Sequence, residues 1–597
     1  MRAEASRSNL TKREFLRRTA VSAMGLGLAG PLRAAGVGTR TNNGAPVSRY
    51  GRWQKEFPPE KQVTRVEFTG PDGKVETRPA FLHQPAKLVY DHQGFETIEP
   101  QGVQVTAVRF TPVQLGRYRW QALAGEEVVD RGAFRSEASH DPGYVRISSR
   151  DPRYFAFSNG DPYCAIGLNL CSPAGQREGG ASGAGGERRT GTYGAESYRQ
   201  RFEQLSKNGC NFCRLWLSNG YFNAQTEVAG ELNLANFAHL DAVVELARRY
   251  GIKLKVCLES ARNPSGQSFP FGIKSPADGQ PPASMDAWFQ GAEWQNWWWR
   301  KLSAYLARYG DDPAIIAWEL WNEINCCHTT NWSVQREWTR QTLPLIKRQA
   351  PRNLVTNSIG SFDDEKFQSW YDDFKMEEMD FQQVHRYLDN GAPWSICHLE
   401  PPLFSADAVQ RTRRPDRPVI LAETGAVRDR HSARFPFYEQ DKRGIVCHDC
   451  SYPAFFAGAA GTGHMWFWSY IERNNLWGGY KPLADLLTGV ELDGEKFRPI
   501  DLSNESIWFY ALLGKKHLLA WARNRADSWY RVLQDQEEPE AVKEQKLTLP
   551  QLGTLSGAMA TTTIWPWNDG TAQAKITHGS LQLPSFHCGL LVKARLS

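Results

Sequence analysis

Short apolar runs alternate along the middle of the chain with longer segments in which apolar residues recur every three or four positions. Such runs are typical of buried parallel strands, and the longer segments are typical of helices with one buried face. Over residues 150–515 this alternation predicts an α/β fold, a (β/α)8 TIM barrel. The runs predict barrel strands at residues 163–169, 211–217, 251–258, 317–324, 381–387, 419–425 and 464–468.

The clearest helical segment begins at Asn236, and its apolar residues Phe237, Leu240, Val243, Val244 and Ala247 share one face. A longer helix is predicted over residues 286–309, before the fourth strand. The apolar segment 507–513 is predicted to be the last helix of the barrel. A glycine-rich stretch at 175–191 follows the first strand and is interpreted as a loop at the rim of the barrel.

The segments on either side of the barrel alternate between apolar and polar residues instead. Stretches at 63–68 and 103–110, with a turn signal at 70–73, predict an N-terminal β-sandwich over residues 45–141. Runs at 517–522, 561–565 and 588–593 predict a C-terminal β-sandwich over residues 516–597. Trp565 and Trp567 lie in this second region, where core packing and sugar contact are both open.

The first 40 residues carry an export pattern rather than a folding pattern. Residues 11–17 resemble a twin-arginine signal, with Lys12 in the place of the first arginine, and an apolar stretch at 20–32 precedes small residues. We expect a bacterial protein exported to the periplasm or outside the cell, without a membrane span in its mature form. A basic amphipathic surface helix is the alternative.

Composition narrows the possible partners. The chain has a formal net charge of +6 from 71 basic and 65 acidic residues, and it contains no long basic tract, so no nucleic-acid partner is expected. Its 22 Trp, 20 Tyr and 29 Phe suit a protein that stacks rings on sugars, although cores use aromatic residues too. We expect a monomer.

Two cysteine clusters lie near predicted strand ends. Residues 447–450 read Cys-His-Asp-Cys and residues 326–328 read Cys-Cys-His. If the clusters meet they can form a disulfide or a metal site, but the spacing matches no standard zinc pattern. We therefore expect neither a metal nor a cofactor. The simpler interpretation of the first cluster is a loop near the cleft, which would close one end of that cleft.

Two of the apolar runs end in a carboxylate. Glu323 ends the run that begins at Ala317, and Glu423 ends the run that begins at Val419. Chemistry in a parallel barrel sits where the strands end, so both side chains should point into one cleft. Two glutamates that face one cleft can act as acid and nucleophile in the cleavage of a glycosidic bond.

The segment Trp321-Asn322-Glu323, followed by Glu423 on a later strand, resembles the retaining β-glycosidases of clan A, most closely the cellulase-like glycoside hydrolases of family 5. The resemblance implies that Glu323 is the general acid/base and Glu423 is the nucleophile. It also implies that Asn322 hydrogen-bonds the sugar 2-hydroxyl.

The same resemblance assigns roles at other strand ends. Arg214 on the second strand matches the arginine that keeps the nucleophile ionised, because a nearby cation lowers a carboxyl pKa. His385 and Tyr387 match a His-x-Tyr pattern at the sugar subsite, and Trp466 or Trp468 is expected to form an aromatic floor under the sugar. These residues together favour a secreted retaining glycosidase over a non-catalytic glycan-binding protein. The sugar, its linkage and endo or exo action stay open.

Overall fold

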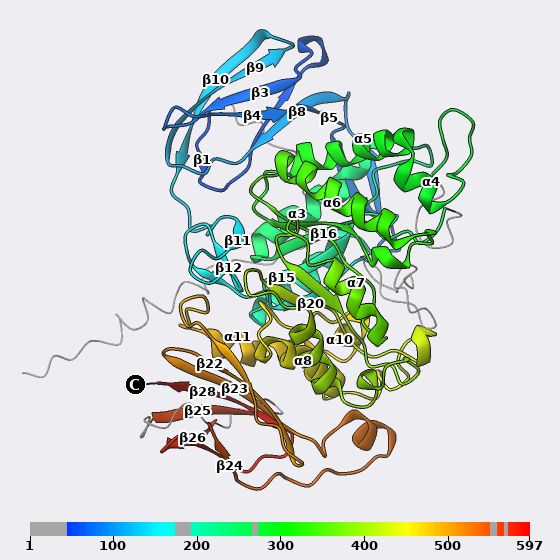
Figure 1. Cartoon of the computed structure of the whole chain (residues 1–597). Helices are drawn as coiled ribbons and strands as arrows, with labels where there is room; N and C mark the ends of the chain where they lie inside the picture. Colours follow the sequence, from blue (N-terminus) through cyan, green and yellow to red (C-terminus); the bar gives the residue numbers. More distant parts are fainter. Residues whose placement is uncertain are drawn as a thin grey trace, which may run out of the picture.

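The computed structural model describes residues 44–173, 193–264, 273–549, 558–565, 567 and 571–596. Figure 1 shows N-terminal sheets in blue at one end of a barrel and a C-terminal sheet in orange and red at the other. The predicted export signal at 1–40 and the glycine-rich stretch at 175–191 lie outside the described residues. Among the described residues, no helix is both long enough and apolar enough to cross a membrane.

The central part is a ring of parallel strands, as expected for a (β/α)8 barrel. Five strands form one sheet in the order β14-β15-β16-β17-β18, and β19 pairs with β20. Asp380 N donates to Val355 O at 2.9 Å and links the two sheets. The strands are β14 (Gly167–Asn169), β15 (Phe212–Trp216), β16 (Lys253–Glu259), β17 (Ile315–Trp321), β18 (Leu354–Thr356), β19 (Gln382–His385) and β20 (Val419–Glu423).

The eighth position of the ring differs from the prediction. Residues 464–468 do not form a full strand; Met465 alone makes parallel bridges to Leu168 on one side and Thr424 on the other. Trp468 already begins helix α10. The prediction of an apolar eighth strand was therefore right about position and wrong about length, because the chain turns into a helix three residues after Met465.

Helices follow the strands around the barrel. The predicted face of α3 is buried as expected, although Asn236 adopts helical dihedral angles and makes no side-chain cap. The single helix predicted at 286–309 is broken at Gly291 into two. The helices are α2 (Ala195–Lys207), α3 (Phe237–Tyr250), α4 (Met285–Gln290), α5 (Ala292–Tyr309), α6 (Trp332–Gln349), α7 (Gln368–Asp373), α8 (Pro401–Thr412), α9 (Ile445–Phe456), α10 (Trp468–Arg473) and α11 (Lys481–Leu487).

A small sheet closes the amino-terminal end of the barrel. Strands β11 (Val145–Ile147), β12 (Phe155–Phe157) and β13 (Pro162–Tyr163) pair in an antiparallel meander. Phe155 and Tyr163 pack with Phe212, Phe381 and Ile420, which lie at the starts of barrel strands or just before them. The opposite, carboxyl-terminal end of the ring is therefore the open end where a site can form.

Two sheets before the barrel enclose one apolar core, as the alternating stretches predict. One has the order β1-β10-β9-β3-β4 and the other β2-β8-β5, and Trp53, Phe68, Phe110 and Phe134 meet between them. The strands are β1 (Val47–Ser48), β2 (Trp53–Phe57), β3 (Arg65–Thr69), β4 (Val75–Pro79), β5 (Phe81–His83), β8 (Val105–Phe110), β9 (Gly116–Ala124) and β10 (Glu127–Glu137). A separate hairpin of β6 (Ala86–Tyr90) and β7 (Glu96–Pro100) contacts α3.

The C-terminal part is one sheet of eight strands in the order β21-β22-β23-β28-β25-β26-β27-β24. Its strands are β21 (Arg498–Asp501), β22 (Ile507–Leu513), β23 (His517–Asn524), β24 (Gln545–Thr548), β25 (Ala558–Trp565), β26 (Thr571–Thr577), β27 (Ser580–Leu583) and β28 (Gly589–Arg595). The helix predicted at 507–513 was wrong, and the sheet begins before the predicted boundary at 516. Phe509 and Ala511 face the core of this sheet while Trp508 and Tyr510 face the barrel core, so the strand is buried on both sides and shows no polar alternation.

Helix α9 joins the C-terminal sheet to the barrel. His448 stacks on Trp565 at 4.5 Å between ring centroids, and Arg523 Nε donates to Asp449 at 2.7 Å. The loop predicted at 447–450 is therefore a buried helical segment and does not close the cleft. All eleven cysteines are free thiols, so the two cysteine clusters do not form the disulfide that the sequence left open. Trp565 is buried in this interface, which corresponds to core packing.

Candidate active site

Glu323 and Glu423 lie together at the open end of the barrel, as the sequence predicts. Glu423 is the last residue of β20, and Glu323 follows β17 by two residues. The Glu323 backbone has a φ of 52° and a ψ of 59°, and its N–H donates to Ser358 Oγ at 2.9 Å. This left-handed turn at a non-glycine residue directs the side chain over the strand ends.

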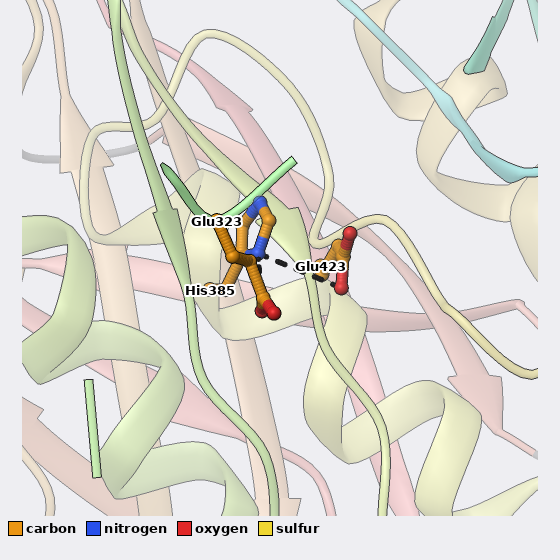
Figure 2. A group of neighbouring side chains, drawn as sticks. All are labelled: Glu323, His385 and Glu423. Atoms are coloured by element: carbon orange, nitrogen blue, oxygen red, sulfur yellow. Dashed lines mark hydrogen bonds and ion pairs between the residues drawn. The ribbon is translucent and has the colours of Figure 1, made fainter. Parts of the chain in front are cut away.

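The two carboxylates are close enough to act on one bond. One oxygen of Glu323, one oxygen of Glu423 and a ring nitrogen of His385 all lie within 4.8 Å of one another. Figure 2 shows the imidazole of His385 between the two glutamates. His385 Nδ1 is 3.0 Å from Glu323 Oε1 and 3.5 Å from Glu423 Oε2.

Glu423 is held from two sides. Arg214 Nη1 donates a charged hydrogen bond to Glu423 Oε1, and Tyr387 Oη donates to Oε2 at 2.6 Å. The residue is only 3% exposed. Each carboxylate oxygen of Glu423 therefore accepts a hydrogen bond, and the two bonds together fix the orientation of the side chain.

Arg214 is itself fixed by a second carboxylate. Its Nε and Nη2 donate to Glu319 at 2.7 and 2.8 Å, and Nη2 also donates to Asn322 Oδ1 at 2.8 Å. Glu319 lies in β17, and its side chain points into the barrel. The two-point contact with Glu319 fixes the plane of the guanidinium, so that Nη1 is left to face Glu423.

A layer of charge therefore lies inside the barrel below the two glutamates. Lys255 Nζ is 3.2 Å from Glu319 Oε2 and also donates to Gln383. Burial would raise the pKa of Glu319, but Arg214 and Lys255 outweigh it and lower the pKa to about 2. Burial lowers the pKa of Lys255 to about 8, against the opposing effect of Glu319. The buried charges persist because each has a partner of the opposite sign.

Glu323 has a cation of its own. Arg262, in the loop after β16, donates from Nη2 to Glu323 Oε2 at 2.5 Å and from Nη1 to the Glu323 carbonyl at 2.7 Å. Burial would raise the pKa of Glu323, but Arg262 and His385 outweigh it and hold the pKa below the usual range of a glutamic acid. In this structure the surroundings of Glu323 therefore favour its ionised form.

The structure brings most of the predicted site residues together. Arg214, Asn322, His385 and Tyr387 surround the two glutamates through the contacts given above. Trp466 packs on Trp216 with ring centroids 5.0 Å apart and is 4% exposed. Trp468 is fully buried at the start of α10, so its expected place in a sugar floor is corrected: its ring belongs to the core.

Sequence reasoning missed four polar residues of this site: Arg262, Glu319, Lys255 and Gln383. Three of them could have been recognised from the sequence. A charged or amide side chain inside an otherwise apolar barrel strand cannot be left unpaired, so Lys255, Glu319 and Gln383 could have been assigned to one another. Arg262 lies in a loop, and nothing in the order of apolar and polar residues predicts its contact with Glu323.

Two groups of side chains in the described chain have the composition of metal ligands. The first is Glu323, His385 and Glu423, whose carboxylates already bind Arg262, Arg214 and Tyr387. The second is Asp363, Asp389 and His431. In the first group the neighbouring arginines supply the positive charge that a metal would otherwise bring.

Comparisons with known proteins concern the family and the fold of the chain. Residues 178–465 match the family model described as cellulase, glycosyl hydrolase family 5. Mannan endo-1,4-beta-mannosidase 4 of Oryza sativa subsp. japonica is 29% identical over 170 residues, which cover 27% of this chain and 37% of the rice protein. Mannan endo-1,4-beta-mannosidase 7 of Arabidopsis thaliana is 25% identical over 323 residues, covering 47% of this chain and 70% of that protein.

The similarity of the whole fold extends further than the similarity of sequence. A solved structure from Bacteroides vulgatus, described as a glycoside hydrolase, superposes with a TM-score of 0.56 at 13% identity and covers 92% of this chain and 100% of its own. At this identity the likeness concerns the fold alone. The matched part spans little more than a third of the rice relative's length, 37%. Residues 178–465 therefore belong to a (β/α)8 domain that is similar to those of glycoside hydrolase family 5.

Proposed function

We propose that the protein is a retaining glycoside hydrolase that cleaves β-linked glycans with Glu323 as acid/base and Glu423 as nucleophile. The observation that carries the proposal is the approach of the two carboxylates, with an oxygen of each and His385 all within 4.8 Å. Retaining enzymes hold their carboxyl groups about 5–5.5 Å apart, whereas inverting enzymes need about 6.5–9.5 Å to admit a water between them.

In the first step, an ionised Glu423 oxygen attacks the anomeric carbon while the bond from that carbon to the leaving oxygen breaks. Arg214 and Tyr387 hold the Glu423 carboxylate in position for this attack. Glu323 gives its proton to the leaving oxygen, which departs as a hydroxyl. Asn322 accepts from Arg214 through Oδ1, an arrangement that orients its amide nitrogen as the donor to the sugar 2-hydroxyl.

In the second step, water replaces the departed sugar. The Glu323 carboxylate takes one proton from that water, its oxygen attacks the anomeric carbon, and the bond to Glu423 breaks with return of the electron pair to the carboxylate. The Arg262 guanidinium beside Glu323 favours this ionised form. For the first step Glu323 must carry a proton, so we infer that contact with the leaving sugar weakens the ion pair between Arg262 and Glu323.

We propose β-mannan as the substrate to which the cleft is best suited, in preference to cellulose. The supporting observation is that the curated relatives given above are mannan endo-1,4-beta-mannosidases. The family description itself names cellulase. The test therefore compares β-mannan with cellulose and includes xylan as a third polymer.

The test measures reducing sugar released from β-mannan, soluble cellulose and xylan by the full chain, by Glu423→Ala and by Glu365→Gln, which removes an exposed carboxylate on the same face of the barrel. We expect release from mannan by the full chain and by Glu365→Gln, and none by Glu423→Ala. With an activated aryl β-glycoside and azide, Glu423→Ala should give the α-glycosyl azide and Glu323→Ala the β-glycosyl azide. Release that persists in Glu423→Ala would contradict the assignment.

A non-catalytic glycan-binding protein is the second candidate. It predicts that glycan binds the full chain, that no sugar is released, and that Glu423→Ala binds as well as the parent. The full set of Arg214, Asn322, Glu323, His385, Tyr387 and Glu423 favours the enzyme, because each group has a part in turnover that simple binding does not require.

We also propose that the flanking regions are β-sandwich domains that pack on the barrel, and that residues 1–40 direct export. Buried ion pairs between the N-terminal sheets and the barrel support a packing role, such as Arg109 with Asp241 at 2.7 Å. Cleavage of the leader is tested by the mass of the mature protein after expression with and without a functional twin-arginine pathway.

A further inference from the structure

A second cluster of titratable side chains lies beside the catalytic groups and has no part in the mechanism above. Asp363 follows β18, Asp389 follows β19, and His431 lies in the loop after β20. Each therefore comes from a loop at the open end of the barrel. The ring of His431 meets the ring of Tyr387 edge-on, with centroids 5.1 Å apart.

The three side chains converge on one point. His431 Nε2 is 3.7 Å from Asp363 Oδ2 and 3.7 Å from Asp389 Oδ2. One atom from each residue lies within 4.8 Å of the other two. These separations are too long for hydrogen bonds, so the three groups face one another without bonding.

Asp389 has a buried carboxylate oxygen, Oδ2, that accepts no hydrogen bond among the described residues. Its side chain is 1% exposed, and its Oδ1 accepts from the backbone N–H groups of Gly391 at 2.9 Å and Arg430 at 2.8 Å. Those two bonds fix the carboxylate and aim Oδ2 at His431. Oδ2 and His431 Nε2 are both buried and have no hydrogen-bond partner among the described residues. A buried carboxylate oxygen of this kind is costly unless a ligand satisfies it.

The charges of the cluster do not balance. Within the described chain, the ion-pair contacts of the Asp363 and Asp389 carboxylates are both with His431, and neither carboxylate makes an ion pair with an arginine or a lysine. The catalytic carboxylates, in contrast, have arginine partners. The cluster is therefore a place where a cation would be stabilised.

We propose that Asp363, Asp389 and His431 form a binding site for one divalent transition-metal cation. His431 Nε2 is 3.7 Å from each aspartate oxygen, and the three ligand atoms lie within 4.8 Å of one another. An ion in the plane of these atoms and at the same distance from all three would lie about 2.1–2.4 Å from each, close to the bond lengths of zinc with imidazole and carboxylate ligands. An imidazole ligand favours a transition metal over calcium or magnesium, which prefer oxygen donors alone. Asp363 and His431 are 20% and 30% exposed, which gives the ion a path from solvent.

A cation bound here would have a positioning role. It would connect the loops that follow β18, β19 and β20. It would also hold the His431 ring against Tyr387, whose hydroxyl donates to Glu423. It would not touch the sugar carbon or either catalytic carboxylate. The site therefore does not depend on the proposed hydrolase activity, and its test measures binding of the metal rather than turnover.

The experiment titrates Zn²⁺ into the chelator-treated, untagged full chain by isothermal calorimetry. We expect one high-affinity ion per chain, and affinity weaker by about 100-fold in Asp389→Asn and in His431→Gln, the upper end of what losing even an outer partner of a metal ligand costs. The matched control is Asp429→Asn, because Asp429 is an exposed carboxylate in the same loop as His431 and lies outside the cluster. Its affinity should equal that of the parent.

Crystals soaked in Zn²⁺ should show an anomalous peak between the three side chains. No binding by the full chain, equal binding by the parent and both cluster variants, or a peak elsewhere would overturn the proposal. If Asp389→Asn does not fold, His431→Gln carries the test, because that side chain is partly exposed. A β-mannan oligosaccharide whose binding is lost in Asp389→Asn, with no zinc bound, would also overturn it and assign the cluster to a sugar subsite.

Discussion

Arg262 makes an ion pair with the Glu323 carboxylate, at 2.5 Å between Nη2 and Oε2. A cation at this distance lowers the Glu323 pKa, and its removal must raise that pKa. In Arg262→Gln, Glu323 should therefore keep its proton to higher pH, and the alkaline limb of the kcat/KM profile should move upward. The profile is measured with an aryl β-glycoside from acid to alkaline pH.

Two variants control this prediction. Arg262→Lys keeps the charge and should leave the limb close to that of the parent, whereas Arg300→Gln removes an exposed arginine of α5 and should change nothing. An alkaline limb that stays in place, or moves downward, in Arg262→Gln would show that Arg262 does not set the protonation of Glu323.

Tyr387 donates to Glu423 Oε2 at 2.6 Å, and Tyr387→Phe deletes that bond while keeping the ring. Hydrogen bonds to charged groups contribute about 1.5–3 kcal/mol, which corresponds to a loss of roughly 10- to 100-fold in kcat/KM. Steady-state kinetics measures the loss. Tyr305→Phe removes another buried hydroxyl, one that binds the backbone of residues 222 and 224, and should cost stability without changing the rate. Equal effects in both variants would contradict a special role for Tyr387.

Glu319 makes the stability of the barrel depend on pH. Its pKa in the folded chain is about 2, below the ordinary value of 4.5, so its contribution is complete above about pH 4.5 and is lost as the pH falls toward 2. Urea denaturation of the parent should show this loss. Glu319→Gln should be less stable by about 3–5 kcal/mol at neutral pH, because it leaves the buried Lys255 without its ion pair and removes one of the two carboxylates that Arg214 binds.

Glu319→Gln should also show a smaller loss of folding stability at acid pH than the parent. Glu365→Gln changes an exposed carboxylate and should follow the parent at every pH. A Glu319→Gln protein whose stability falls over the same range as steeply as the parent would show that other carboxyl groups account for the acid sensitivity.

Asp449 joins α9 of the barrel to Arg523 of the C-terminal sheet. Asp449→Asn removes the charge that Arg523 binds at 2.7 Å in a buried interface, and loss of a buried partner costs about 3–5 kcal/mol. Calorimetry should show a lower unfolding temperature. Asp485→Asn breaks an exposed ion pair with Lys481, worth about 1 kcal/mol or less, and should change the temperature little. An unchanged transition in Asp449→Asn would mean that the two parts unfold independently of this contact.

Most of the barrel and the centre of its site could be predicted, because strand ends in a parallel barrel share one face. That rule alone brings Glu323, Glu423, Arg214 and His385 together from distant segments. It does not extend to Arg262, whose position depends on the conformation of a loop. Nor does it separate a strand buried on both faces from a helix, which is why residues 507–513 were assigned wrongly.

The predicted aromatic floor shows another limit. The pattern placed Trp466 and Trp468 on one strand, but the ring of the barrel is completed at Met465 and the chain then turns into α10. A short apolar run does not reveal where pairing stops, because the end of the strand is decided by its neighbours. Trp468 is consequently in the core.

The short pairing around Met465 places one side chain at the joint where the barrel closes. In addition to backbone bonds such as Asn169 N–H to Met465 O at 3.0 Å, the Asn169 side chain donates to the carbonyls of Ala422, His464 and Met465, at 3.1, 3.1 and 3.3 Å. The other end of the same amide lies 3.4 Å from Arg214, the residue that holds the Glu423 carboxylate. One side chain thus connects the joint that closes the barrel to Arg214, so a change at this joint would also shift the arginine that binds the Glu423 carboxylate.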